Sequence, residues 1–474
     1  MSVSNKVIPS LKIRIPNFCQ SEQKYALDVL LNQFLGLTFD VETYLSDVIE
    51  ITKPDASEVD SLNMATLTLD ASFFHKAHHS WLKPESMPVF PMKNWNLIND
   101  GIEANLVAPT VPVIYGKSGL VKNGDKFHLN LDIFGSAFFM LSRYEELITK
   151  DRDKHDRFPA TSSVAFKEGF LERPIINEYL EILWACMKQL WPDLKRRKRR
   201  PATDVSCDVD DPFDCLVNHP ITLLKTSVMD VLKRRDIKLA IKRVVNLPMS
   251  HFGVRRFDPY NTFEWYMNIC SENNLQATFY FIVDNTAGKI DGCYSVYEEK
   301  ITKLIGSIIN NGHKIGVHGS YNTYKNQPQV EKEYFIFQRE LVEKYNYNFP
   351  IGIRQHYLRV DYSQTHDILD RVGYDYDASG GYADSPGFRF GVCYDFPMWS
   401  FINKRKLHIV QKPLIAMDVT FYASCKEMKI GMLLDNLKKK CHMFNGTFSI
   451  LWHNSQLYSG RKEVFSRLLG SQHD

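Results

Sequence analysis

The sequence predicts an α/β protein, with an N-terminal α+β domain ahead of a longer domain of alternating strands and helices. After Pro201, short β-branched and aromatic runs alternate with stretches of helical periodicity, as in parallel strands joined by helices. Before it, mixed elements end in the basic run Lys195 to Arg200, which indicates a linker. We therefore predict an N-terminal domain at 1–194, a linker at 195–201 and a second domain at 202–474.

The elements of the N-terminal domain follow from periodicity alone. Residues 12–15 and 65–69 alternate like strands, whereas 25–35 and 132–146 have helical spacing. A further amphipathic helix begins at Pro174 and ends before Trp191. Between these helices lie charged residues that we interpret as a structural brace: Arg143, Glu145, Glu146, His155 and Arg157. No chemistry can be assigned to this domain.

From 276 onward, predicted strands alternate with predicted helices in the second domain. The strands are 202–207, 276–283, 314–317, 350–353 and 447–452, and the helices are 297–310, 332–345, 364–372 and 432–443.

Charge and composition limit the partners. The chain has 474 residues, 44% hydrophobic and 24% charged, with a net charge of +3, which argues against a nucleic-acid-binding polycation. The basic runs Lys195–Arg200, Lys233–Arg235 and Lys242–Arg243 are solvated surface, or they contact anionic lipid headgroups or a diphosphate-linked substrate. Both interpretations stay open, and peripheral membrane contact through Lys195–Arg200 is one partner prediction.

Cysteine usage and the apolar runs predict a cytoplasmic protein. The nine cysteines are scattered and form no CxxC pair, so we expect reduced thiols. The N-terminus lacks the pattern of a signal peptide, and no apolar run is long enough to span a bilayer.

Three carboxylates follow the strand at 202–207, namely Asp208, Asp210 and Asp211. Acids this close repel one another, and a divalent cation would offset the repulsion. The strand lies at the start of the second domain, and carboxyl ends of parallel strands are where such folds do chemistry.

Later strands also end in polar side chains: His318, Arg354 and His453. A carboxylate, an imidazole and one further nitrogen or oxygen ligand, with a position open to water, make a hydrolytic metal site. A second Asp is then available as general base, His453 as general acid, and Arg354 as the partner that orients the base.

Residues 202 to about 460 resemble the polysaccharide deacetylases, metal-dependent esterases that remove N-acetyl groups from sugars. Five segments carry the resemblance in order: the Asp208-x-Asp210 pair, 277–281, 312–322, 354–357 and 451–455. The resemblance implies a distorted (β/α) barrel for the second domain. Residues 130–190 resemble the N-terminal domain of a bacterial subgroup linked to surface-polysaccharide synthesis.

The resemblance also implies roles for single residues. Asp208 would be the general base, Arg354 its partner and His453 the general acid. Asp210 and His318 would bind the metal, with Asp211 as the rival for Asp210 one position on. Asn322 stands where the family has a second histidine ligand. For Asp377 two roles stay open, tethering His453 or capping a turn, and Tyr357, Tyr382 and Trp452 are candidate substrate contacts.

The predicted activity is zinc-dependent hydrolysis of the acetyl group of an N-acetylated sugar or polysaccharide precursor. Two alternatives stay open. One is a hydrolase of another non-peptide amide, and the other is a non-catalytic sugar-binding or scaffolding protein, which Asn322 in place of histidine favours.

Overall fold

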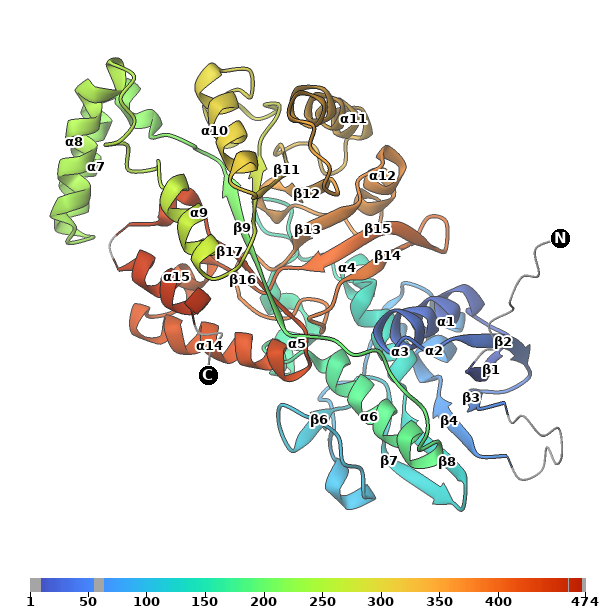
Figure 1. Ribbon diagram of the computed structural model, residues 1–474. Coiled ribbons are helices and arrows are strands. Elements are labelled where there is room, and N and C mark those ends of the chain that lie inside the picture. The colour runs from blue at the N-terminus through green and yellow to red at the C-terminus, as the bar shows by residue number, and fades with distance from the viewer. Residues whose placement is uncertain (1–9, 55–63, 459, 471–474) are drawn as a thin grey trace.

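The computed structural model describes residues 10–54, 64–458 and 460–470, and it contains two large β-sheets with helices packed around them (Figure 1). The first nine residues, part of the stretch from which the absence of a signal peptide was inferred, lie outside this range.

The first sheet is built from the N-terminal part of the chain and is mixed, in the order β2-β1-β3-β4-β8-β7. Its strands are β1 (Leu11–Pro16), β2 (Phe39–Tyr44), β3 (Val48–Thr52), β4 (Thr66–Asp70), β7 (Gly116–Asn123) and β8 (Lys126–Leu131). A small separate ladder pairs β5 (Asn94–Asn96) with β6 (Thr110–Pro112). The helices of this part are α1 (Gln20–Leu27), α2 (Ser72–Ser80), α3 (Ile133–Leu141), α4 (Tyr144–Ile148), α5 (Val164–Lys167) and α6 (Ile175–Leu190).

The second sheet has nine strands, in the order β14-β15-β13-β12-β11-β10-β9-β17-β16. All neighbours in it run parallel except β14 and β15. The strands are β9 (Ala202–Val209), β10 (Ala277–Phe281), β11 (Lys314–Gly319), β12 (Gly352–Gln355), β13 (Tyr376–Gly380), β14 (Phe396–Ser400), β15 (Arg405–Pro413), β16 (Ala416–Met417) and β17 (Thr447–Leu451).

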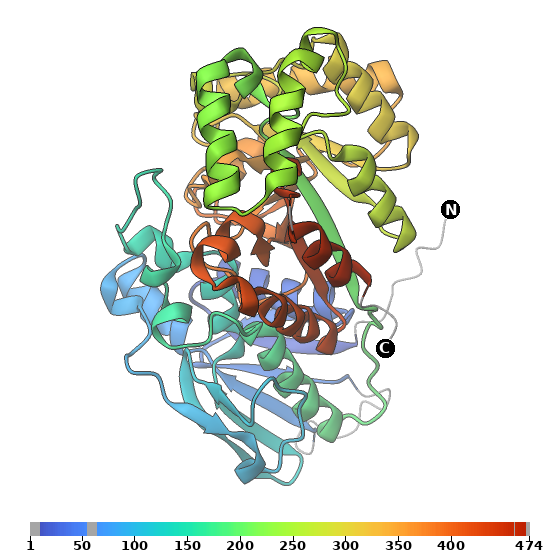
Figure 2. The ribbon, with the colours of Figure 1, turned by 90° about the vertical axis from the view of Figure 1, so that its left-hand side faces the viewer.

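The helices of this second half are α9 (Phe263–Glu272), α10 (Glu299–Asn310), α11 (Gln327–Phe337), α12 (Thr365–Val372), α13 (Asp418–Ser424), α14 (Glu427–Met443) and α15 (Arg461–Gly470). A pair, α7 (Pro220–Leu232) and α8 (Ile237–His251), projects from the body at one side (Figures 1 and 2).

All five predicted strands of the second domain are present, in the predicted order along the chain. The mixed α/β class is therefore confirmed. The distorted barrel stays a prediction, because the recorded strand pairs form one open series from β14 to β16.

The helix predicted at 132–146 is instead two helices. Its residues are apolar enough for one helix, but the chain breaks at Arg143, whose φ is 58°. That break aims the Arg143 guanidinium at Glu145 Oε1, 2.6 Å away, and at Glu146 Oε1, 2.8 Å away.

One cluster of buried apolar side chains runs through both halves of the chain, from Leu11 to Leu469. Phe138 of α3, for example, packs edge to face on Trp399 of β14, with ring centroids 5.3 Å apart. The division at 195–201 stays a prediction, since packing continues across it.

Two predictions about the chain's environment can be compared with the structure. No helix among the described residues is long and apolar enough to cross a membrane. The prediction that all nine cysteines are reduced is wrong for one pair, because Cys215 and Cys293 form a disulfide. Their separation of 78 residues hid this pairing from the sequence pattern.

Candidate active site

Five of the predicted site residues meet at the carboxyl edge of the nine-stranded sheet: Asp208, Asp210, His318, Arg354 and His453. Parallel register places His318 of β11 beside Arg354 of β12, and β9 lies between β10 and β17. These strand ends form the floor of a cavity of about 630 Å³, which Asp208, Asp210, His318 and His453 line.

Asp210 lies against two imidazoles at this floor. Its Oδ1 is 3.2 Å from His318 Nε2 and 3.6 Å from His356 Nε2. Oδ1 is buried, yet it accepts no hydrogen bond from any described residue. Burial raises the pKa of Asp210, but the imidazoles of His356, His318 and His453 outweigh it and hold the pKa below its usual range.

Both imidazoles have their Nδ1 atoms engaged from behind. His318 Nδ1 is 2.8 Å from the carbonyl oxygen of Arg354, and His356 Nδ1 is 2.9 Å from Asp291 Oδ1. Because those partners are acceptors, each Nδ1 donates, so each Nε2 presents a lone pair to Asp210 when its imidazole is neutral. This is how metal-binding histidines are oriented by their outer partners.

Asp210, His318 and His356 therefore fit a divalent metal. A carboxylate and two imidazoles are ligands typical of zinc. The orphaned Oδ1 atom supports the fit, since a buried carboxylate oxygen ordinarily has a partner.

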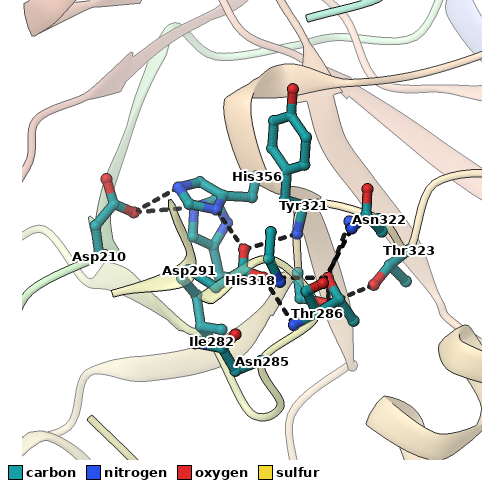
Figure 3. A network of polar contacts seen from close by, with 12 residues as sticks. Asp210, Ile282, Asn285, Thr286, Asp291, His318, Tyr321, Asn322, Thr323 and His356 are labelled. Carbon is teal, nitrogen blue, oxygen red and sulfur yellow. Dashed lines mark hydrogen bonds and ion pairs between the residues drawn. The ribbon is translucent and has the colours of Figure 1, made fainter. Parts of the chain in front are cut away.

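Asn322, the predicted third ligand, lies elsewhere. Its Nδ2 donates to the carbonyl oxygen of Thr286 (3.0 Å), and its backbone N–H donates to Thr286 Oγ1 (3.0 Å). Thr286 in turn donates to Asp291 Oδ2, so Asn322 supports the residue that orients His356 (Figure 3). His356 thus takes the place predicted for Asn322, because it follows β12 directly and reaches over the strand end.

Asp208 is held by Arg354. Arg354 Nη1 lies 2.9 Å from Asp208 Oδ1 and also donates to Ser206 Oγ, and its Nε donates to the carbonyl oxygen of Ala378. Both side chains are buried. The other oxygen, Asp208 Oδ2, is 3.7 Å from His318 Nε2. The predicted pairing of Arg354 with Asp208 is present, and Asp208 keeps one oxygen toward the site.

His453 is tethered by Asp418, at the start of α13. His453 Nδ1 is 2.7 Å from Asp418 Oδ1, and the backbone N–H of His453 donates to Asp418 Oδ2. Burial lowers the pKa of His453, but Asp418 and then Asp210 and Asp208 raise it to about 10. His453 Nε2 faces Asp210 Oδ2 at 3.6 Å.

Asp377 does not tether His453. It is buried in β13 and contacts His366 Nε2 at 3.1 Å, while its Oδ1 accepts from the backbone N–H of Ser379. Of the two roles left open by the sequence, only a local one fits these contacts.

Asp211, the rival for the metal position, lines the cavity without joining the two imidazoles. Burial, with the charges of Asp210 and Asp214, raises its pKa to about 6.

The three predicted substrate aromatics differ in position. Tyr357 lines the cavity and is 38% exposed. Tyr382 and Trp452 are buried and cannot touch a substrate: Tyr382 accepts a hydrogen bond from Arg143, and Trp452 packs on Phe421. Both lie in the main cluster of buried apolar side chains.

The N-terminal part of the chain contributes one wall of the cavity. Arg157 lines it and donates from Nη1 to the carbonyl oxygen of Tyr357 (3.0 Å). His155 packs on the Tyr357 ring with centroids 4.5 Å apart and the two planes tilted by 41°. The brace predicted for these two residues therefore reaches the site. Arg143, Glu145 and Glu146 form a separate buried network with Arg389.

Sequence reasoning missed three site residues. His356 stood inside a segment already singled out, two residues after Arg354, and its type was the available signal. Asp291 lies in the loop after β10, and Asp418 follows the two-residue strand β16. Neither had a periodic pattern that would draw attention.

Residues 11–192 match a family of unknown function, DUF7033. No curated protein of known function matches the chain significantly. Among solved structures, a putative polysaccharide deacetylase from Mycobacterium smegmatis is similar at 14% identity and a TM-score of 0.35, covering 60% of this chain and 87% of that one. Puue allantoinase is similar at 13% identity and a TM-score of 0.35, with coverage of 59% and 85%. A probable polysaccharide deacetylase from Pseudomonas aeruginosa PAO1 is similar at 14% identity and a TM-score of 0.34, with coverage of 57% and 84%.

Proposed function

We propose that this protein is a metal-dependent hydrolase that removes the acetyl group from an N-acetylated sugar or polysaccharide precursor. The observation that carries the proposal is the group Asp210, His318 and His356, with an unpartnered Asp210 oxygen, between the Asp208–Arg354 and His453–Asp418 pairs. A metal site flanked by a general base and a general acid is one arrangement that hydrolyses amides.

Asp210, His318 and His356 would hold zinc. Zinc, when bound, acidifies water and polarises the acetyl carbonyl. Asp208, fixed by Arg354, takes a proton from the attacking water through Oδ2. The new bond joins the water oxygen to the acetyl carbon.

His453 acts on the other side of the reacting carbon. Asp418 accepts from its Nδ1, which leaves Nε2 facing the cavity as the proton donor. As the C–N bond breaks, Nε2 gives its proton to the sugar amine, and acetate is the second product. Asp418 raises the pKa of His453 and so favours the protonated form of this donor.

The cavity rim favours a substrate with negative charge. The exposed Lys289 lines it, together with Arg157, which also pairs with Asp153. Tyr357 is a partly exposed aromatic ring that a sugar can contact. A nucleotide- or lipid-linked sugar diphosphate has this charge, so we take such a precursor as the substrate class.

The test is acetate release from a panel of N-acetyl sugars, free and diphosphate-linked, by protein loaded with zinc. Asp208→Asn and His453→Ala should each abolish release while the bound metal stays at one per chain. A cyclic ureide in the same panel tests the alternative amide hydrolase. Zinc bound at one per chain with no acetate released from any sugar would refute the deacetylase and leave the sugar-binding alternative.

A further inference from the structure

The helical pair α7–α8 has apolar side chains on its outside. It is inserted between the acidic end of β9 and helix α9, and it stands away from the body (Figures 1 and 2). Ile221 is 73% exposed, Leu232 70% and Phe252 79%. With them, nine more apolar residues of 221–257 are exposed: Leu224, Val228, Met229, Val231, Ile237, Ile241, Val244, Val254 and Phe257. An exposed apolar surface of this extent marks an interaction site.

These residues follow the helical repeat. On α7, Ile221, Leu224, Val228 and Val231 recur every three or four positions and form one exposed stripe. The opposite face of α7 is buried and carries Leu223, Ser227 and Asp230. On α8, Ile237, Ile241 and Val244 are exposed with the same spacing. A helix that only covered a core would have its apolar stripe inside, so these stripes have another partner.

The same segment is strongly basic. Residues 219–257 contain nine Lys and Arg against two Asp, a net charge of +7 in a chain whose total is +3. Lys225, Lys233, Arg235 and Lys238 are exposed on it. Apolar stripes flanked by cations are the pattern of helices that lie in the interface of an anionic membrane.

The pair is fixed to the rim of the cavity. Arg243 of α8 is buried and pairs with Asp230 of α7 and with Asp214, at the base of the pair. Asp258 accepts from the backbone N–H of Asp214 at 3.0 Å. Asp214 follows three residues after Asp211, which lines the cavity. These contacts hold α7–α8 in a fixed orientation beside the cavity.

From this geometry we infer that α7–α8 docks the protein on an anionic membrane surface, with its apolar side chains in the interface and its cations at the headgroups. Binding to nucleic acid would leave the apolar stripes uncovered. Self-association through this face would bring two charges of +7 together. Membrane docking by α7–α8 does not depend on the proposed hydrolysis. The further idea that docking brings a lipid-linked sugar to the cavity rests on the proposed function.

The experiment is flotation of the full chain with vesicles of phosphatidylglycerol and phosphatidylcholine in equal parts, against vesicles of phosphatidylcholine alone. We expect binding to the anionic vesicles only, weakening with salt. The triple variant Lys225→Gln, Lys233→Gln, Lys238→Gln should lower the partition coefficient roughly 100-fold, since each cation contributes about fivefold. The double variant Leu224→Gln, Ile241→Gln should also lower it, at least ~10-fold, because less apolar surface is buried.

The matched control neutralises three exposed cations of the linker, Lys195→Gln, Lys198→Gln and Arg200→Gln, and should leave the partition coefficient within about twofold. Melting temperatures confirm that the variants are folded. Loss of binding in the linker variant alone would move the contact to the linker and overturn the inference. So would equal binding to neutral vesicles, a stable dimer that Leu224→Gln, Ile241→Gln dissolves, or capture of RNA in place of vesicles.

Discussion

Two buried clusters of charge in this protein differ in how completely they are satisfied. Around Arg143 and Arg389, every carboxylate has a cation: Arg389 donates two bonds to Glu146, and Arg143 bonds to Glu145, Glu146 and Tyr382. Glu145 also accepts from the backbone N–H of Val164. At the site, by contrast, Asp210 Oδ1 faces two nitrogen lone pairs and accepts no hydrogen bond within the described chain.

The difference separates a structural cluster from a binding one. Burial makes an uncompensated charge costly, so a cluster that serves folding closes on itself. A cluster that binds a cation keeps a carboxylate oxygen without a donor on the side where the cation binds. The ion pairs of Glu145 and Glu146 with their arginines are 2.6 to 2.8 Å long, whereas Asp210 Oδ1 is 3.2 and 3.6 Å from its two imidazoles. The presence or absence of a donor to the carboxylate therefore separates the two clusters.

The largest expected effect is loss of the metal. His318→Ala removes one of two imidazole ligands, and we expect no tightly bound zinc and a fall in acetate release of about 10³-fold or more. Elemental analysis and an acetate assay measure the two effects. The matched control is His366→Ala, a buried histidine paired with Asp377 outside the site, which should keep the metal. Metal retained in His318→Ala would show that the ligands are other residues.

In the cluster around Arg143 and Arg389, the expected effect is a loss of folding stability. Glu146→Ala leaves Arg143 and Arg389 without their shared carboxylate, and the free energy of unfolding in urea should fall by about 3–5 kcal/mol. Bound zinc should stay at one per chain. If instead Glu146→Ala lost its zinc and kept its stability, the cluster around Glu146 would be the one that binds the metal.

The tether of His453 should affect turnover and its pH dependence. Asp418→Asn removes the carboxylate that raises the pKa of His453, and we expect kcat to fall about 10²-fold. Because the donor must be protonated, its lower pKa moves the alkaline limb of the profile to lower pH. Asp377→Asn is the control variant, and the alkaline limb of its pH profile should stay where it is in the parent protein. A pH profile identical in Asp418→Asn and the parent would contradict the assignment.

The smallest effect compares Asn322, the ligand predicted from sequence, with His356, the ligand we propose from the structure. Asn322→Ala loosens Thr286 and, through it, Asp291, so zinc affinity should fall by less than about 10-fold. His356→Ala should lower it far more. Competition with a chromogenic chelator measures both. A larger loss in Asn322→Ala than in His356→Ala would restore Asn322 as the ligand.

The sequence located the floor of the site because parallel strands deliver their last residues to one edge. Asp208, Asp210, His318, Arg354 and His453 all follow strands that the residue pattern made visible. Their mutual arrangement needed no knowledge of the loops.

The carboxylates that orient the site histidines could not be predicted from strand patterns. Asp291 lies in the connection after β10 and Asp418 begins α13 directly after β16, so their approach to His356 and His453 depends on how these connections fold back. The prediction that Tyr382 and Trp452 contact substrate was wrong for a different reason. An aromatic residue near a strand end looks the same in sequence whether it faces the groove or the core. The helices α7 and α8 were not predicted from the sequence.

The contact between Phe138 and Trp399 has a consequence for synthesis. Translation at about 5–20 residues per second would produce Trp399 roughly 13–50 s after Phe138. Helix α3, which is entirely buried in the finished protein, has no complete cover during that interval. The nascent N-terminal half therefore presents an apolar surface to chaperones or to neighbouring chains, and its yield in a cell should depend on how quickly the second half follows.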